Sequence, residues 1–294
     1  MFLGRYKTML SSDCKLIYNT KDYHRKRLKV LEKEKYIRRI DRSYIKLDDK
    51  GTKIVKEFGY DYSFKCRKKS YIDRLNEIAR IAALGLNSNI EFVASWDLKD
   101  YTIFTEKSRK YIGQLKYQEK ERITYYISRD KQTTYISQII NDIQKLVNYE
   151  NIIIFMENIE ILKNYKRFIF GKESTLIIKP TQQNFEVMRK LNDIDPYQII
   201  KLIYHNKEIL LSNWINADYM TEENDYILWM PFIDIEKLHS LNISFKNNQM
   251  KNKKIDILTL KDNKEKINEI LINKSNIIEI DNWLGGSNEN KQKS

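Results

Sequence analysis

The first chemically suggestive feature of this sequence is a run of cationic side chains between residues 19 and 47. Lysine and arginine neutralise backbone phosphates, and planar side chains beside them can meet bases, so this composition is typical of a nucleic-acid-binding surface. Tyr23, His24 and Arg25 stand where the first turn of a helix would approach bases. The sequence therefore predicts contacts to double-stranded DNA from the following side chains: Tyr23, Arg25, Lys26, Lys29, Lys33, Arg38, Arg39, Arg42 and Lys46.

Net charge is confined to the same end of the chain. The 294 residues carry a formal net charge of +13, and residues 1–70 contain 21 lysines and arginines against 9 aspartates and glutamates. The remaining 224 residues contain 32 against 31 and are almost neutral. Such segregation favours a local positive surface for a polyanion. The alternatives are ordinary solvation of a helix face and docking of a protein partner through the same module.

The pattern of the first 60 residues predicts a winged helix-turn-helix domain. Residues 20–34 have helical spacing, and residues 36–40 and 44–47 alternate as two short strands joined by a tight turn. An aspartate pair then begins a helix that Gly59 is placed to end. Helix, hairpin and helix in this order are typical of a winged helix, with residues 20–34 in the major groove and the hairpin on phosphate or the minor groove.

Two details of this domain leave alternatives open. His24 shares the apolar face of the helix with Leu28 and Leu31, which favours an interior position over a contact to bases. A winged helix has two helices before the recognition helix, and residues 6–16 can supply one. The domain would then complete its core against the second domain or a second subunit, so a homodimer is among the expected partners.

The rest of the chain predicts one α/β domain. Residues 61–70 form a basic linker, residues 71–284 form the domain, and residues 285–294, polar and rich in Gly and Ser, form a disordered tail. Apolar residues have helical spacing over residues 72–86, and the strands and helices after them favour a sheet covered by helices. Beyond residue 180 no motif carries recognisable chemistry. Strands are expected at 90–96, 101–104, 111–117, 124–127, 152–156, 176–178, 208–211, 226–229, 255–258 and 277–280, and helices at 136–149, 159–167, 184–191 and 196–204.

Three stretches within residues 15–180 occur in an order that is similar to a known family. They are RLKVLEKEKYIRRI with YIKLDDKGTKIVKE, YIDRLNEIARIAALG with FVASWDLK, and RKYIGQLKYQEKERITYYISRDKQTTYISQIINDIQKLVNYENIIIFMEN. On these stretches the chain resembles the replication-relaxation family of plasmids and conjugative elements. The resemblance implies a winged helix followed by a restriction-endonuclease-like domain, a mixed sheet flanked by helices. It also implies a relation to relaxases, which nick DNA for mobilisation.

The carboxylates of the family's cleavage site are largely replaced in this chain. Metal-dependent cleavage of a phosphodiester needs clustered carboxylates and often a lysine, which the resemblance places in a Pro-Asp pair and a Glu-x-Asp motif. Residues 111–114 (YIGQ) and 128–130 (SRD) stand there instead, so only Asp130 remains. Lys145 matches the family's lysine, although a lysine on a helix surface normally serves solvation. Asp130 and Lys145 are the catalytic candidates, and no cofactor is expected unless a relaxase activity uses Mg²⁺ or Mn²⁺.

Tyrosines offer another route to DNA cleavage. One of Tyr125, Tyr126 and Tyr135 could form a phosphotyrosyl intermediate. Alternating aromatic residues in a strand more commonly fill a core. The three histidines are far apart in sequence and do not predict the histidine metal site of other relaxases.

These observations predict a cytoplasmic DNA-binding protein of a plasmid or other mobile element. Its expected role is replication initiation or conjugative mobilisation without catalysis, beside replication or conjugation proteins. An active relaxase or nickase is the first alternative, and a plasmid transcriptional repressor is the second. The cytoplasm and the exclusion of a membrane are expected because there is no signal peptide, no apolar run near the ~20 residues that cross a bilayer, and no disulfide pattern in Cys14 and Cys66.

Overall fold

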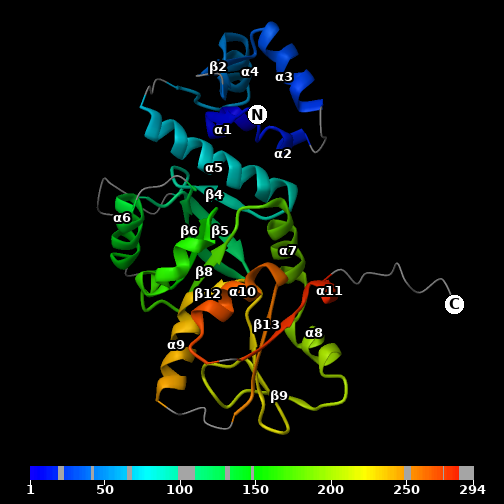
Figure 1. Ribbon diagram of the computed structural model, residues 1–294. Helices are drawn as coiled ribbons and strands as arrows, with labels where there is room; N and C mark the ends of the chain where they lie inside the picture. The colour runs from blue at the N-terminus through cyan, green and yellow to red at the C-terminus, as the bar shows by residue number, and fades with distance from the viewer. Residues whose placement is uncertain are drawn as a thin grey trace, which may run out of the picture. The chain divides into compact units, whose positions relative to one another are not determined.

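A computed structural model of the protein describes residues 1–18, 23–40, 43–64, 68–98, 110–129, 133–146, 149–247, 253–273 and 275–284. The fold is mixed α/β with three sheets, in agreement with the predicted class. The chain divides into two compact units (Figure 1), which we call the N-terminal unit (Met1–Lys99 with Ile112–Gln114) and the C-terminal unit (Asp100–Tyr111 with Leu115–Ser294).

The N-terminal unit contains a three-stranded antiparallel sheet with helices packed on it. The strand order is β1-β3-β2, so Ile45 in the central strand pairs with Met9 on one side and Arg39 on the other. The elements are α1 (Phe2–Tyr6), β1 (Thr8–Leu10), α2 (Lys15–Tyr18), α3 (Tyr23–Lys33), β2 (Ile37–Ile40), β3 (Tyr44–Leu47), α4 (Asp49–Glu57), α5 (Lys69–Asn87) and β4 (Phe92–Ala94).

The strand β1 corrects the single helix that was predicted over residues 6–16. The Thr8 hydroxyl donates a hydrogen bond to the carbonyl oxygen of Ile45 at 2.8 Å, and Met9 is fully buried. A turn over residues 11–14 then leads into α2. Strand pairing replaces the helix here because it adds a third strand to a hairpin that would be marginal by itself.

The hairpin and the helix after it form where the sequence predicts them. β2 and β3 pair in antiparallel register, and α4 ends just before Gly59. The φ of Gly59 is +81°, the left-handed conformation that glycine adopts at helix ends. The start of α4 lies beside the turn that precedes β2, since the Asp48 amide donates to the carbonyl oxygen of Tyr36 at 3.0 Å.

The helix α5 belongs to the N-terminal unit, whereas the sequence placed it at the start of the second domain. The Tyr44 hydroxyl donates a hydrogen bond to Oδ1 of Asp73 at 2.8 Å, and the Asn87 side-chain amide donates to the carbonyl oxygen of Leu16. The apolar positions that predicted this helix are buried, and the helix packs on β1. The division between compact units therefore lies near residue 99 and not at residue 70, because the small sheet is covered by α5.

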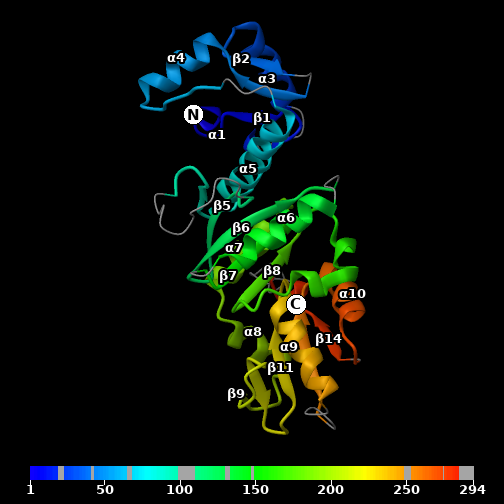
Figure 2. The same ribbon diagram turned by 90° about the vertical axis from the view of Figure 1, so that its left-hand side faces the viewer.

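Parallel strands form the centre of the first sheet of the C-terminal unit. Its strands β12, β8, β7, β6 and β5 are neighbours in that order, with β6, β7 and β8 parallel and β12 antiparallel to β8. Phe155 of β7 stacks on Phe185 of α7 with 5.4 Å between ring centroids, and Figure 2 shows α6 and α7 against these strands. The elements are β5 (Gly113–Tyr117), β6 (Lys120–Ile127), α6 (Thr133–Gln144), β7 (Asn151–Met156), the 3₁₀ helix η2 (Ile159–Phe168), β8 (Ser174–Ile178), α7 (Gln182–Asp193) and β12 (Ile233–Asp234).

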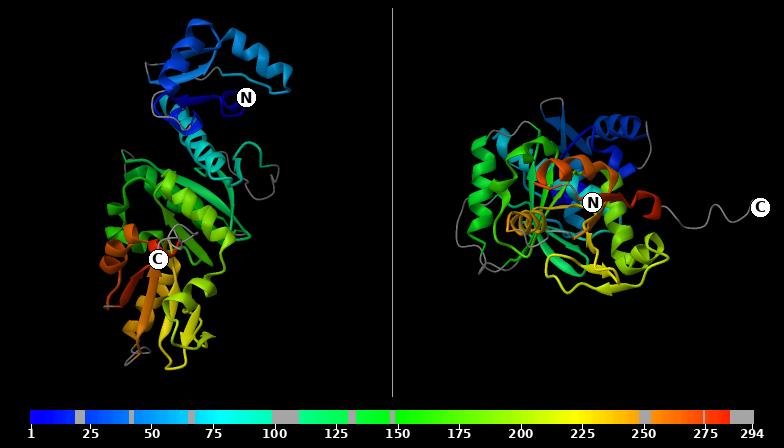
Figure 3. Two further views of the ribbon diagram at one scale, coloured as in Figure 1. Left: turned by 90° about the vertical axis from the view of Figure 1, so that its right-hand side faces the viewer. Right: turned by 60° about the horizontal axis from the view of Figure 1, so that its bottom comes forward.

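A second sheet of the C-terminal unit has the order β14-β13-β11-β10-β9. β11, β13 and β14 are parallel, and β10 is antiparallel to both of its neighbours. Tyr197 of α8 lies 6.0 Å from Tyr219 of β10 between ring centroids, and Figure 3 shows α8 beside these yellow strands. β10, β12, α9 and α10 were not predicted. The elements are α8 (Pro196–Ile203), β9 (Ile209–Leu211), β10 (Tyr219–Thr221), β11 (Tyr226–Trp229), α9 (Ile235–Lys246), β13 (Ile255–Thr259), α10 (Lys261–Ile270), β14 (Asn276–Glu279) and α11 (Asp281–Leu284).

Part of the sequence-based interpretation concerns residues outside the described ranges. These are the helix start at residues 19–22, the hairpin tip with Arg42, linker residues 65–67, the strand at 101–104, Asp130 and the tail at 285–294. Within the described ranges, none of the helices is long and apolar enough to span a bilayer.

We expect Gly51→Ala to destabilise the N-terminal unit. A Cβ atom there would lie 2.1 Å from the carbonyl oxygen of Tyr36, which the Asp48 amide holds in place. The clash should outweigh the better helix propensity of alanine and cost about 2 kcal/mol. Urea denaturation followed by circular dichroism measures the change, with Lys53→Ala on the exposed side of α4 as the control. Equal midpoints for the two variants would contradict the close packing of α4.

Candidate nucleic-acid interface

The helix α3 buries one side and exposes cations on the others. His24 and Leu28, four residues apart, are only 5% and 4% exposed. Leu28 lines the same apolar interior as Ile37 and Ile45 of the sheet. This placement leaves the polar residues of the helix outside, and Arg27 is an exposed cation that the sequence analysis did not include. The exposed polar residues of α3 are Tyr23, Arg25, Lys26, Arg27, Lys29 and Lys33, and Val30 is exposed as well.

The predicted cations on α3 form no ion pairs with the carboxylates that the structure describes. Over the described part of the chain, no ion pair or side-chain hydrogen bond engages Arg25, Lys26, Lys29 or Lys33. A phosphate group could therefore approach these side chains without breaking an internal contact. This is the arrangement expected of a surface that neutralises a polyanion.

The cations of the hairpin are less available than those of α3. Nε of Arg39 lies 3.2 Å from Oε2 of Glu32, and Nε of Arg38 lies 3.7 Å from Oδ1 of Asp48. Lys46 is half-buried, with Nζ 5.0 Å from the centre of the Phe64 ring. Burial, and to a lesser degree Arg38, lowers the pKa of Lys46. Phosphate contacts from the hairpin would compete with these internal contacts.

His24 lies in the interior, in agreement with the apolar-face interpretation of the sequence. Its side chain is buried, and Nδ1 has no hydrogen-bond partner among the described residues. Tyr23, by contrast, is 55% exposed and contacts the Tyr18 ring edge-on, with 5.8 Å between centroids. Of the three side chains considered for base contacts, Tyr23 and Arg25 are accessible and His24 is not.

The stretch at residues 111–114, where a Pro-Asp pair was considered from the sequence, has no space for an acidic side chain at Gly113. A Cβ atom on Gly113 would lie 2.3 Å from the carbonyl oxygen of Val93 and 2.6 Å from the Phe92 ring. The Ser95 amide donates to the carbonyl oxygen of Ile112 at 3.0 Å, which holds the two segments together. Close backbone approach therefore gives a physical reason for glycine at this point.

Only one of the two catalytic candidates, Lys145, lies within the described ranges. Lys145 follows the last residue of α6 and is exposed, and Asp130 lies outside the described ranges. The amide of Arg129, the residue before Asp130 in the sequence, donates a hydrogen bond to Oε2 of Glu157 at 2.9 Å. Among the described residues, no three His, Cys, Asp or Glu side chains are grouped in a way that could hold a metal ion.

Two of the three candidate tyrosine nucleophiles are inside the C-terminal unit. Tyr125 and Tyr126 on β6 are fully buried. The Tyr125 hydroxyl donates to Oδ2 of Asp142 at 3.2 Å, and the Tyr126 hydroxyl donates to Oε1 of Glu157 at 2.7 Å. Tyr135 is half-buried, and Nζ of Lys110 lies 5.2 Å from its ring centre. These contacts are those of core tyrosines, and the partners Asp142 and Glu157 were not expected from the sequence.

Comparisons with protein-family models, with curated proteins and with solved structures found no match to this chain.

We expect His24→Leu to leave DNA affinity unchanged and to raise the free energy of unfolding by up to about 1 kcal/mol, because it removes a buried nitrogen that has no partner. Leu28→Ala, on the same side of α3, should instead lower it by about 3 kcal/mol. Urea denaturation and fluorescence anisotropy with labelled duplex DNA measure the two quantities. A tenfold loss of DNA affinity in a stable His24→Leu protein would show that His24 contacts bases.

Proposed function

We propose that this protein binds duplex DNA through the exposed cationic surface of α3. The observation that supports the proposal is the one-sided burial of His24 and Leu28, which leaves Arg25, Lys26 and Lys29 exposed and without carboxylate partners among the described residues. Nearly all of the net charge of the chain also lies in its first 70 residues. Both features favour a polyanionic ligand.

The order of elements supports the interpretation of the first 60 residues as a winged helix-turn-helix. The chain runs through α1, β1, α2, α3 and the hairpin of β2 and β3, and the sheet order is β1-β3-β2. In this interpretation α2 and α3 are the helix-turn-helix pair, α3 is the recognition helix in the major groove, and the hairpin is the wing. The proposed DNA-contacting residues remain Tyr23, Arg25, Lys26, Lys29, Lys33, Arg38, Arg39, Arg42 and Lys46, and those on α3 should contribute most.

We further propose that the C-terminal unit is a non-catalytic scaffold. Its mixed sheet with flanking helices agrees with what the resemblance to the replication-relaxation family implies, and the residues at 111–114 and 128–130 depart from the cleavage motifs. The protein would then act in the cytoplasm at a plasmid or mobile-element site, in replication initiation or conjugative mobilisation. Its partners would be replication or conjugation proteins, or a second copy of the chain.

Either of two results in vitro would assign a different function to this protein. Nicking of supercoiled plasmid in Mg²⁺ or Mn²⁺ that disappears in Asp130→Ala would make the protein a relaxase-type enzyme. A footprint over a promoter and not over an origin would make it a transcriptional repressor.

The electrostatic proposal predicts steep salt dependence of DNA binding. If ~6 phosphates are neutralised, affinity for duplex DNA should fall about 10³-fold between 50 and 200 mM salt. The triple substitution Lys26→Ala, Lys29→Ala and Lys33→Ala should weaken binding to all sequences and reduce the slope of log affinity against log salt by about three. Fluorescence anisotropy across a salt series measures both effects.

The matched control replaces three exposed lysines of the C-terminal unit, Lys163, Lys201 and Lys246, with alanine. This variant has the same change in net charge, so it should keep the wild-type slope if α3 makes the phosphate contacts. An equal loss of slope in both variants would show that total charge, and not the surface of α3, governs binding.

A further inference from the structure

A polar cavity of about 400 Å³ lies within the C-terminal unit, and none of its lining residues was among the predicted site residues. It is lined by residues of both sheets and of the first turn of α9. Three cations line it, Lys120, Arg122 and Lys237, together with the aromatic residues Tyr117, Trp229 and Phe232. Its volume is within the range of roughly 300–1,000 Å³ that is usual for small-molecule sites.

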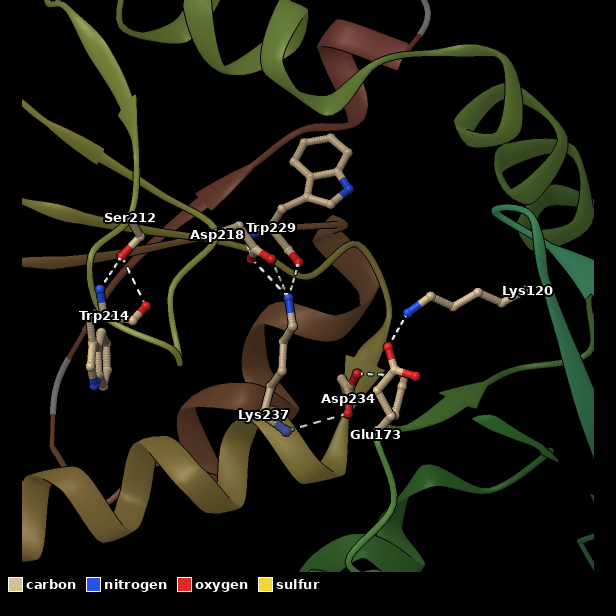
Figure 4. A network of polar contacts seen from close by, with 9 residues as sticks. Lys120, Glu173, Ser212, Trp214, Asp218, Trp229, Asp234 and Lys237 are labelled. Carbon is tan, nitrogen blue, oxygen red and sulfur yellow. Dashed lines mark hydrogen bonds and ion pairs between the residues drawn. The ribbon is translucent and has the colours of Figure 1, made fainter. Parts of the chain in front are cut away.

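Two of the three cations have carboxylate partners (Figure 4). Nζ of Lys237 lies 2.7 Å and 2.8 Å from the two carboxylate oxygens of Asp218, which also accepts a hydrogen bond from the Trp229 amide at 2.8 Å. Lys120 forms an ion pair with Glu173, and the hydrogen bond from Lys120 lowers the pKa of that carboxyl group. These two cations are therefore already balanced.

The buried carboxylate of the cavity, Asp234, is also satisfied. Its Oδ2 accepts a hydrogen bond from the Ser174 hydroxyl at 2.7 Å, and its Oδ1 accepts from the amide of Glu236 at 3.1 Å at the start of α9. A helix N-terminus stabilises a carboxylate at this position. Both carboxylate oxygens of Asp234 thus have hydrogen-bond donors other than Arg122.

Arg122 is the cation that remains under-satisfied. It is 3% exposed, yet its guanidinium makes one hydrogen bond, from Nη1 to the Ser174 hydroxyl at 3.2 Å. Nε has no partner among the described residues, although a guanidinium has five N–H donors. Burial lowers the pKa of Arg122, and the Tyr117 ring lies 5.7 Å from its guanidinium carbon.

A second buried donor in the cavity wall also lacks a partner. Trp229 is 8% exposed, and its indole Nε1 makes no hydrogen bond within the described ranges. Buried donors in native proteins are nearly always paired, so these two donors at one cavity would be satisfied by an acceptor from outside the chain, an ordered water or a ligand oxygen.

We propose that this cavity binds a small organic molecule carrying an oxyanion, either a carboxylate or a phosphate. The planar fork of Arg122 matches the geometry of both groups, and the indole N–H of Trp229 adds a donor. The cavity is several times larger than one such group, and the aromatic side chains of Tyr117 and Phe232, 6.1 Å apart between centroids, offer a surface for the apolar part. This site is independent of the proposed DNA surface.

Isothermal titration calorimetry on the full chain tests the proposal with matched probes. The phosphate pair is thymidine 5′-monophosphate and thymidine, and the carboxylate pair is phenylacetate and phenylacetamide. We expect the charged member of one pair to bind saturably and at least about tenfold more tightly than its uncharged partner. The pair that responds identifies the oxyanion, and inorganic phosphate as a separate probe should bind more weakly than the organic anion.

Two variants assign the binding to this cavity. Arg122→Lys keeps the charge but removes the fork and should weaken binding about tenfold, whereas Arg189→Lys on the exposed side of α7 should not change it. Trp229→Phe keeps the ring and removes the N–H, and should weaken binding about threefold to tenfold. Its control is Trp214→Phe. If Arg122→Lys does not fold, the comparison of Trp229→Phe with Trp214→Phe shows whether the anion binds in this cavity.

The proposal is overturned if no charged probe binds at up to about 5 mM, if charged and uncharged partners bind equally, or if Trp229→Phe and Trp214→Phe have the same affinity. The triple lysine substitution on α3 should leave anion binding intact and Trp229→Phe should leave DNA binding intact. Failure of one proposal is thereby distinguished from failure of the other.

Discussion

The pairing of β1 with β3 is the interaction on which the proposed DNA surface depends. β2 and β3 have four residues each, and a hairpin of that size is marginal in water. The third strand buries Met9 against the central strand and gives α5 a surface to cover. Leu28 then packs α3 on this small core. A rotation of α3 about its own axis would bury its cations, and burying a charge without a partner costs far more free energy than exposing Leu28. The cations of α3 therefore face outward because α3 packs on a core that the three-residue strand β1 helps to form.

The cations of this chain fall into two physical classes that suit different ligands. Those on α3 are exposed, so each contributes weakly and is screened by salt, and their effect comes from number and placement. Arg122 is buried, and its Nε has no partner among the described residues, so its effect comes from geometry and from the cost of leaving an N–H donor unpaired. A polyanion fits the first arrangement, and a small oxyanion fits the second.

Much of the fold could be predicted from local pattern, since the apolar run of β7, the spacing of α5 and the glycine after α4 each act over a few residues. β1 could not, because its strand conformation arises from a partner 37 residues away in sequence. From the sequence, Lys29 and Arg39 are both cations of the same basic segment. Only the tertiary contacts show that Arg39 forms an ion pair with Glu32 and that Lys29 forms none among the described residues. The cavity was missed for the same reason, because no local spacing connects Arg122 with Trp229.

The most direct test of the DNA-binding proposal is site-specific photocrosslinking to duplex DNA. p-Benzoylphenylalanine would replace Val30, which is 42% exposed on α3, and in a second protein Ile243, which is 44% exposed on α9. Both positions carry an exposed apolar side chain on a helix, so the crosslinking residue has a similar exposure and the same secondary structure in the two proteins. We expect a covalent DNA adduct from position 30 that high salt abolishes, and no adduct from position 243. Adducts from position 243 alone, or from neither position under conditions where DNA is bound, would contradict the proposal.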